Sequence, residues 1–530
     1  MLVGICQLNP TVGALAENAD AIIDAYRSVV RDGAGLAVFG ELAVCGYPPE
    51  DLVLKHRFLL DCRVQVDRIA AATGDCVALV GFPEASDGLR YNSAAVCRHG
   101  VVEAVVRKHA LPNYDVFDED RWFEPGIRHQ PLFEIDGTTV GVSICEDIWV
   151  EGGPTTGQAS AGATLLVNLN GSPFRAGRQD DRAAVVSARA RETGVPVVYV
   201  NQVGGQDDLV FDGGSMVVGP EGIRHAGPRF SEWVSVVDIT VSGDSRAPLD
   251  IPGEMWGALV LGTRDYVEKN GFSHVAVGLS GGVDSSIVAA IAVDALGPER
   301  VHGVLMPSRY SSPGSVDDAV TLCALLGIEH RVIPIEPAHA AFEAMLSDSY
   351  GGREPGLTDE NVQSRIRGVT MMALSNLEGW LVLTTGNKSE TAVGYSTLYG
   401  DTAGALAVIK DVWKTEVYEL CRWRNERGDG DRIPEAVLTK APSAELRPNQ
   451  RDDQSLPAYE VLDPLLAAYI DDDLTITDLV AAGHDSELVA RICRLVDLAE
   501  YKRRQTPPGL RISAKAFGRD RRLPITNRYR

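Results

Sequence analysis

The chain has 530 residues, too many for one hydrophobic core, so we expect two or more domains. Its formal net charge of −23 argues against a nucleic-acid-binding protein, which needs a basic surface. No apolar run reaches the ~18 residues of a membrane span, and the nine cysteines are scattered, so we expect a cytoplasmic protein with neither membrane nor nucleic-acid partners.

Short apolar runs alternate with amphipathic segments in the first half of the chain. The runs predict buried strands at Leu2–Cys6, Leu36–Phe39, Cys76–Phe82, Val140–Cys145, Leu165–Leu169 and Val195–Val200. The amphipathic segments predict helices at Ala14–Arg31, Phe58–Ala72 and Gln179–Thr193. This pattern indicates a layered α/β domain over residues 1–245.

Three apolar runs of this domain are followed by a reactive side chain, namely Glu41, Lys108 and Cys145. A thiol becomes nucleophilic when a base removes its proton, and a carboxylate can serve as that base. A nearby lysine would favour the thiolate and stabilise a developing oxyanion. From the spacing alone, the alternative that Cys145 is a small core residue stays open.

The segments Glu41–Leu52, Lys108–Glu119 and Cys145–Trp149 resemble the three signature segments of the nitrilase, or carbon–nitrogen hydrolase, superfamily, and more narrowly its glutaminase branch. The resemblance implies an αββα sandwich in which Glu41 is the general base, Lys108 the electrostatic partner and Cys145 the nucleophile. One departure is Gly40, which stands where the family usually has proline.

The same resemblance implies a glutamine site. Its residues would be Tyr114, Ser172 and Arg178, the last two from the loop Asn170–Arg178, with Phe117 and Glu119 as further pocket candidates. An amino-acid substrate carries its own carboxylate, which a guanidinium can bind through two hydrogen bonds.

A segment rich in proline, glycine and serine, Ser242–Gly253, interrupts the strand pattern before a predicted helix at Glu254–Asn270. We therefore expect a linker over residues 246–258 and a second domain over residues 259–530. There the pattern predicts strands at His274–Val277, Val301–Met306, His330–Ile335 and Trp380–Thr384, with helices at Ser285–Leu296, Val316–Leu326 and Asp359–Leu377. This order indicates a doubly wound parallel sheet, which binds ligands at the carboxyl ends of its strands.

A glycine-rich turn joins the first of these strands to its helix. It comprises Gly278, Leu279, Ser280, Gly281, Gly282, Val283, Asp284 and Ser285. Its backbone N–H groups and the helix N-terminus favour an anion, and Asp284 would tolerate a phosphate only with a cation such as Mg²⁺ between them. The turn lacks the Gly-Lys-Ser/Thr of a Walker A loop and resembles the pyrophosphate loop of the ATP pyrophosphatase family.

Further polar segments follow the predicted strands or lie on the long helix. Arg309 could reach ATP phosphates, and Glu390 is a second candidate ligand for Mg²⁺. Together with the turn, these segments resemble the synthetase domain of the NAD synthetase family. The resemblance implies ATP contacts at Thr385, Lys414 and Ser443, and deamido-NAD contacts at Asn361, Arg365, Glu390 and Lys502.

Both resemblances together imply a homo-oligomeric ligase of NAD biosynthesis that uses ATP and Mg²⁺. It would adenylate deamido-NAD(+) and replace AMP by ammonia, which Cys145 would release from glutamine. Two alternatives stay open. One is another pyrophosphate-loop amidotransferase, and the other is an amidase with a nucleotide-sensing domain.

Overall fold

The computed structural model describes residues 1–243, 248–427, 430, 432–448, 450, 454 and 456–528. The chain divides into two compact units, Met1–Asp250 and Ile251–Arg530, each with its own hydrophobic cores. Residues 246 and 247 of the predicted linker lie outside the described ranges. Among the described residues, none of the helices combines the length and the apolar character needed to cross a lipid bilayer.

The first unit contains two six-stranded sheets. One has the order β14 (Trp233–Asp238), β1 (Leu2–Gln7), β2 (Leu36–Val38), β3 (Val77–Ser86), β4 (Leu89–Arg98) and β5 (Val101–Arg107). The other has the order β13 (Gly222–Ala226), β12 (Met216–Gly219), β9 (Val197–Asn201), β8 (Leu165–Asn170), β7 (Thr138–Ile144) and β6 (Leu132–Ile135). A separate ribbon pairs β10 (Val203–Gln206) with β11 (Leu209–Asp212).

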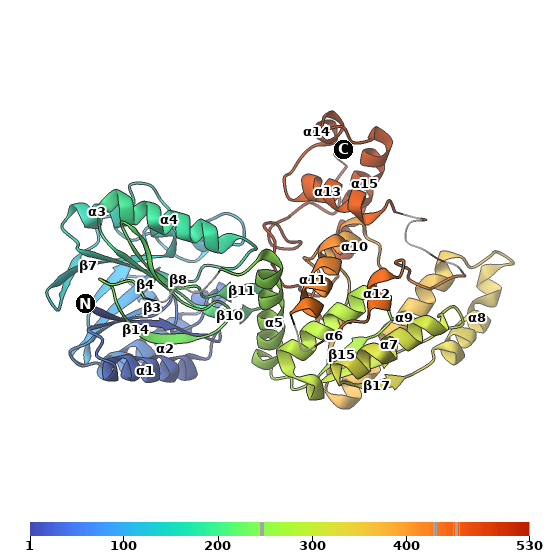
Figure 1. Ribbon diagram of the computed structural model, residues 1–530, viewed down its shortest axis with the longest axis horizontal. Helices are drawn as coiled ribbons and strands as arrows, with labels where there is room; N and C mark the ends of the chain where they lie inside the picture. The colour runs from blue at the N-terminus through green and yellow to red at the C-terminus, as the bar shows by residue number, and fades with distance from the viewer. Residues whose placement is uncertain are drawn as a thin grey trace. The chain divides into compact units, whose positions relative to one another are not determined.

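Helices cover the outer face of each sheet. Figure 1 shows the sheets between α1 (Leu15–Arg31) and α2 (His56–Ala71) on one side, and α3 (Pro154–Ser160) and α4 (Arg178–Thr193) on the other. The αββα sandwich predicted for this half is therefore confirmed.

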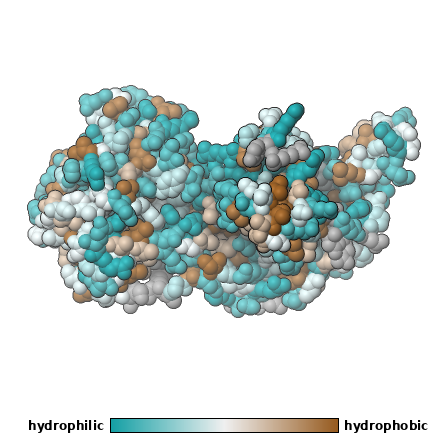
Figure 2. Space-filling view, turned by 90° about the horizontal axis from the view of Figure 1, so that it is seen from above, coloured by the Kyte–Doolittle hydropathy of each residue, from teal (hydrophilic) through white to brown (hydrophobic). Residues whose placement is uncertain are grey.

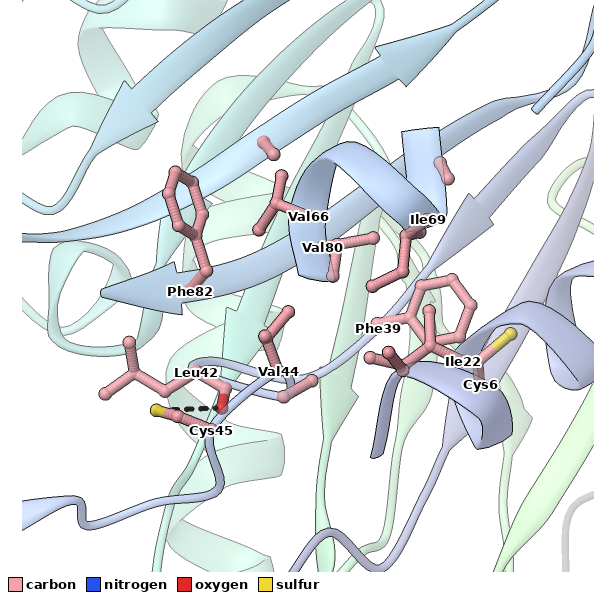
Figure 3. Packing of buried hydrophobic residues seen from close by; sticks show 14 of the residues in the cluster. Cys6, Ile22, Phe39, Leu42, Val44, Cys45, Val66, Ile69, Val80 and Phe82 are labelled. Carbon is pink, nitrogen blue, oxygen red and sulfur yellow. Dashed lines mark hydrogen bonds between the residues drawn. The ribbon is translucent and has the colours of Figure 1, made fainter. Parts of the chain in front are cut away.

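Strand alternation produces the separate cores of this sandwich. In β1, Val3 and Ile5 lie in the core between the two sheets, whereas Cys6 lies in the core beneath α1 and α2. Successive side chains of a strand point to opposite faces, so one strand contributes to both cores. Figure 3 shows Val66 and Ile69 of α2 close to Val80 of β3 in the helix-side cluster.

The second unit is built on a five-stranded sheet. All its strand pairs are parallel, in the order β17 (Glu329–Val332), β16 (Val301–Leu305), β15 (Val275–Gly278), β18 (Leu381–Thr384) and β19 (Leu406–Ala407). The predicted doubly wound parallel sheet is confirmed. The order reverses between β15 and β18, and such a switch point opens a ligand-binding crevice outside the carboxyl ends of the strands.

Helices surround this sheet: α5 (Ile251–Lys269), α6 (Val283–Leu296), α7 (Pro313–Leu326), α8 (Glu336–Tyr350), α9 (Leu357–Glu378), α10 (Lys388–Val393), α11 (Lys414–Glu426) and α12 (Glu435–Thr439). The sheet is followed by a helical cluster of α13 (Tyr459–Ile470), α14 (Ile476–Ala481), α15 (Ser486–Leu498) and α16 (Glu500–Arg503). α13, α14 and α15 pack together with Ala392 of α10 around one hydrophobic core (Figure 1).

The predicted strand His330–Ile335 differs from the observed strand, which begins one residue earlier and ends three residues earlier. The strand β17 begins at Glu329 and ends at Val332, two residues before Pro334. Proline has no N–H group to donate to a neighbouring strand, so the apolar run continues beyond the strand itself.

Candidate active sites

The three predicted reactive residues of the first unit lie together. Glu41 follows β2, Lys108 follows β5 and Cys145 follows β7, so side chains from both sheets meet at their strand ends. Nζ of Lys108 donates to Oε1 of Glu41 at 2.7 Å, and all three side chains are buried. Cys145 begins a short 3₁₀ helix, η3 (Cys145–Ile148), with a φ of +44°. That left-handed conformation is strained for a residue with a Cβ and is a feature of reactive sites.

Glu41 is held in place from both oxygens. Oε1 also accepts a hydrogen bond from Nδ2 of Asn92 at 2.7 Å, and Oε2 accepts one from the backbone N of Gly171 at 2.8 Å. A Cβ on Gly171 would lie 3.0 Å from the ring of Tyr47 and 3.3 Å from Oε2 of Glu41. Glycine therefore allows the backbone to approach the carboxylate closely.

The thiol of Cys145 is protonated in this environment. Burial raises its pKa well above the ordinary value, the charge of Glu41 raises it further, and Lys108 lowers it. A buried thiol becomes nucleophilic only when its proton is taken by a base. Glu41 is the carboxylate that acts most strongly on this thiol.

A second carboxylate, that of Glu119, completes the cluster. Nζ of Lys108 donates to Oε1 of Glu119 at 2.8 Å, and the hydroxyl of Tyr47 donates to the same oxygen at 2.9 Å. Burial raises the pKa of Glu119 to about 7, against the opposing effect of Lys108. Burial opposes the charge on Lys108, but Glu119 and Glu41 raise its pKa well above the ordinary value. The sequence indicated Glu119 only as a pocket candidate.

The three predicted glutamine ligands have different surroundings. The hydroxyl of Tyr114 donates to Glu146 at 3.0 Å, and the guanidinium of Arg178 lies 4.2 Å from the ring centre of Trp149. Ser172 is buried, and its backbone N donates to Oδ1 of Asn201 at 2.9 Å. Burial raises the pKa of Tyr114 and of Glu146, and the positive charge of Arg178 offsets a small part of the rise in both groups, so its charge reaches both.

Two residues that the sequence did not identify support this site. Glu146 directly follows Cys145 and burial raises its pKa. Arg182 is fully buried; Nε donates to Oγ of Ser172 at 3.1 Å, and NH1 donates to Asp212 at 2.7 Å. The sequence did contain one signal for Arg182. It lies four residues after Arg178, so the two side chains share one face of α4.

In the second unit, the glycine-rich turn lies between β15 and α6, as predicted. Gly281 has a φ of +77°, and a Cβ there would lie 2.1 Å from the backbone oxygen of Ser315. Only glycine can occupy this position. The hydroxyls of Ser285 and Ser286 donate to the backbone oxygen of Gly282 at 3.1 and 2.8 Å, which holds the turn against the first turn of α6.

Asp284 and Glu390 both contact the ammonium of Lys414. Nζ of Lys414 donates to Asp284 and lies 3.6 Å from Oε1 of Glu390, and Nδ2 of Asn387 donates to Asp284 at 2.9 Å. Burial opposes the charge on Lys414, but Asp284 and Glu390 raise its pKa well above the ordinary value. The two carboxylates supply the oxygen ligands that a hard divalent cation prefers.

A cavity of about 510 Å³ lies at the carboxyl ends of β15, β16 and β18. Seven predicted residues line it: Gly278, Leu279, Ser280, Asn361, Thr385, Ser443 and Lys502. The later part of the turn, with Gly281, Gly282, Val283, Asp284 and Ser285, is not part of its lining, and neither are Glu390 and Lys414.

Two predicted arginines lie elsewhere. The guanidinium of Arg309 is paired with Glu336 and Glu343, the latter at 2.9 Å. Arg365 is exposed, and its Nε donates to the backbone oxygen of Leu398 at 3.2 Å. The structure therefore brings neither of them to the cavity wall in this conformation.

The remaining predicted cavity residues are held by neighbours. Thr397 donates from Oγ1 to Oδ1 of Asn361 at 2.8 Å, and Oγ of Ser443 donates to the backbone oxygen of Gln450 at 2.6 Å. Nζ of Lys502 donates to the backbone oxygens of Gly394 and Ser396, both at 2.7 Å. The cavity wall also contains Arg367, which the sequence analysis did not single out.

These features define the class of protein. A buried cysteine, lysine and glutamate on an αββα sandwich are the arrangement of a cysteine-dependent hydrolase, and a glycine-rich turn at the switch point of a parallel sheet is that of a nucleotide-binding domain. The two family models that match the chain agree with this division. Residues 2–245 match carbon–nitrogen hydrolase, and residues 255–506 match NAD synthase.

Curated relatives match along the whole chain. The glutamine-dependent NAD(+) synthetase of Xylella fastidiosa strain 9a5c is 47% identical over 540 residues, covering 100% of this chain and 99% of its own. That of Thermotoga maritima is 44% identical over 570 residues, with the same coverage. The solved structure of the Acinetobacter baumannii enzyme in complex with ADP is 42% identical with a TM-score of 0.81, covering 99% of this chain and 98% of that one.

The chain belongs to the family of glutamine-dependent NAD(+) synthetases.

Proposed function

We propose that this enzyme converts deamido-NAD(+) to NAD(+) with ATP, using ammonia that its first domain releases from glutamine. The observation that carries the proposal is the full-length similarity to glutamine-dependent NAD(+) synthetases, together with the two family models that match this chain. We assign the glutaminase reaction to residues 1–245, a linking role to residues 246–258 and NAD synthesis to residues 259–530.

In the proposed glutaminase reaction, Glu41 takes the proton of the Cys145 thiol as sulfur attacks the side-chain amide of glutamine. The ammonium of Lys108 stabilises the negative charge that develops on the amide oxygen. Collapse of this intermediate breaks the C–N bond and leaves a glutamyl thioester, while the nitrogen departs as ammonia with the proton from Glu41. Glu41 then removes a proton from water, which hydrolyses the thioester to glutamate and restores the thiol.

We propose that glutamine is bound as a zwitterion beside Cys145. Arg178, with Ser172 and Tyr114, would hold its α-carboxylate end, and Glu146 would hold its α-ammonium group. Opposite charges at Arg178 and Glu146 favour a substrate that carries both a carboxylate and an ammonium.

Substrate analogues test this arrangement. The variant Glu146→Gln should raise KM for glutamine about 10-fold and leave unchanged the KM for glutaramic acid, which lacks the α-ammonium. An equal rise for both substrates would assign Glu146 a general structural role instead. Ammonia-dependent NAD(+) formation serves as the internal control.

For the second domain we propose that ATP occupies the cavity and the glycine-rich turn, with contacts from residues 278–285 and from Thr385, Lys414 and Ser443. Arg309 would join them after leaving its glutamate partners. Asn361, Arg365, Glu390 and Lys502 would bind deamido-NAD(+). The presence of ADP in the Acinetobacter baumannii structure supports nucleotide binding.

Asp284 and Glu390 fit Mg²⁺, because the carboxylate oxygens of both converge on one positive charge, the ammonium of Lys414. A hard divalent cation prefers such carboxylate ligands. When bound, the ion neutralises charge on the triphosphate. The carboxylate of deamido-NAD(+) attacks the α-phosphorus of ATP, and pyrophosphate leaves toward the N–H groups of the turn. Ammonia then attacks the acyl adenylate, AMP departs, and the carboxamide of NAD(+) remains.

One assay tests the whole proposal. The enzyme is supplied with ATP, deamido-NAD(+) and glutamine while NAD(+), AMP and glutamate are followed together. We expect NAD(+) and AMP in a 1:1 ratio, with at least one glutamate for each. Glutamate without AMP would support the amidase with a nucleotide-sensing domain, and AMP without NAD(+) would indicate another amidotransferase.

We also propose that the enzyme is a cytoplasmic homo-oligomer. All nine cysteines lie in the described ranges, are buried and form no disulfide, which fits a reducing compartment. Hydrophobic side chains are exposed on the face shown in Figure 2, and on α9 the exposed fractions of Val369 and Leu377 are 69% and 75%. Light scattering should give a mass that falls toward the monomer in Leu377→Glu; a monomeric parent enzyme would contradict the proposal.

A further inference from the structure

Arg367 is a cation at the cavity wall with few partners. It lies on α9, and its Nε donates to the backbone oxygen of Met306 at 3.0 Å, directly beyond the end of β16. Within the part of the chain that the structure describes, its guanidinium has no carboxylate within ion-pair distance and no other hydrogen bond. The guanidinium therefore has unused donors, and Arg367 lines the cavity.

The other basic side chains that the sequence predicted as substrate contacts in this unit are paired or exposed to solvent. Arg309 is paired with two glutamates, Lys414 with two carboxylates, and Nζ of Lys502 with two backbone oxygens. Arg365 is exposed to solvent. Among these five, Arg367 is the one that is partly buried, has no acidic partner and makes a single hydrogen bond in the described part of the chain.

Partial burial of Arg367 without an ion pair has an electrostatic consequence. It lowers the pKa of Arg367 to about 10, an effect that Glu445 partly offsets from beyond ion-pair distance. A guanidinium that has lost part of its contact with solvent without gaining a carboxylate is stabilised most by an anion that can accept two of its hydrogen bonds. A phosphate group has that geometry.

The position of Arg367 selects one phosphate. Leu279 and Ser280 line the same cavity, and the backbone N of Leu279 donates to Val304 of β16 at 2.9 Å. The first residues of the turn therefore lie beside the end of the strand that anchors Arg367. The later residues of the turn, which would bind the β- and γ-phosphates at the start of α6, are not part of the cavity lining.

We propose that Arg367 binds the α-phosphate of ATP, the group that is transferred to deamido-NAD(+). The inference rests on the proposed binding of ATP in this cavity. Its hydrogen bonds would strengthen as charge builds on the α-phosphoryl oxygens during attack. Deamido-NAD(+) also carries phosphates, so the experiment must separate the two sources.

The experiment compares AMP with adenosine, which differ only in this phosphate. Isothermal titration of the full-length enzyme should show AMP binding weakened at least 10-fold in Arg367→Met and partly recovered in Arg367→Lys. Adenosine binding should stay within twofold. The control Asn376→Met, at an exposed position on the same helix, should bind both ligands as the parent enzyme does.

Ammonia-dependent kinetics supply the second measurement. Arg367→Met should raise KM for ATP and lower kcat, while KM for deamido-NAD(+) and the glutaminase activity stay unchanged. Equal weakening of AMP and adenosine would assign Arg367 to the base, and a rise in KM for deamido-NAD(+) alone would assign it to that substrate; either result overturns the inference. Failure of the parent enzyme to bind AMP would instead overturn the proposed nucleotide site.

Discussion

Replacement of Lys108 by methionine tests the electrostatic account of the glutaminase centre. The substitution keeps most of the side-chain volume and removes the only cation that contacts both Glu41 and Glu119 among the described residues. The side chains of Lys108 and Glu41 are fully buried, and that of Glu119 is 1% exposed. Two carboxylates would then remain in the protein interior without a counter-charge.

The size of the effect follows from this burial. Removing one partner of a buried ion pair costs about 3–5 kcal/mol when the other partner stays charged. Glu119 limits that cost, because burial raises its pKa to about 7 even beside Lys108, and the loss of Lys108 raises it further, so that a bound proton can neutralise it. We therefore expect the loss of stability to be smallest at pH 6 and to grow as the pH rises to 9. Glutamine hydrolysis should fall by about 10²–10³, the usual effect of removing an oxyanion stabiliser.

Hydrogen exchange of the amides in β2 and β5 reports the stability of the first unit, and glutamate release reports catalysis. Lys388→Met is a matched control, because Lys388 is equally buried in the second unit and lies 3.0 Å from Asp411 and 3.2 Å from Asp471. It should leave both readings unchanged. A loss below about 1 kcal/mol at pH 9, or glutaminase activity within tenfold of the parent, would refute the reasoning.

Three further predictions concern single residues. Cys145→Ala should abolish NAD(+) formation from glutamine but not from ammonia, so loss of both would show that the two sites are misassigned. Asp284→Ala, or removal of divalent cations by a chelator, should abolish NAD(+) formation from either nitrogen source; synthesis that persists would disprove the metal role. Glu119 has a folded pKa of about 7, above its unfolded value, so the folded state binds more protons between pH ~4.5 and ~7. The free energy of unfolding of the first unit should therefore fall with rising pH in this window, and Glu119→Gln should flatten that slope in hydrogen-exchange measurements at a series of pH values.

The sequence predicted the layers of both units because their central strands are continuous apolar runs. It did not predict β4, where residues such as Asn92 and Ser93 interrupt the apolar pattern although both side chains are buried. Nor did it predict the helices after Glu378. Their core combines residues distant in sequence, such as Trp413, Leu462 and Ile492, and a local window contains no trace of such a contact.

For the sites, motifs predicted side chains that follow strands, because a strand end places the next residue at the edge of a sheet. They could not predict which side chains face one another. Nothing near Arg309 in the sequence indicates its pairing with Glu336 and Glu343, which lie 27 and 34 residues further along the chain. Likewise, the partnership of Asn92 with Glu41 becomes visible only when two strands of one sheet are built.

The two sites share one electrostatic arrangement, and their difference follows from it. Each contains a buried ammonium between two carboxylates: Lys108 between Glu41 and Glu119, and Lys414 between Asp284 and Glu390. In the first site the side chains of Lys108, Glu41 and Glu119 are all buried, so the lysine stays paired with its two carboxylates. Under the proposed function its charge would act only on an oxyanion that forms beside it. In the second site Asp284 and Glu390 are about one-fifth exposed. Under the proposed function a divalent cation would bind these two carboxylates and leave the ammonium of Lys414 to a phosphate. We infer that the enclosed cluster suits acyl transfer and the more exposed cluster suits nucleotide binding.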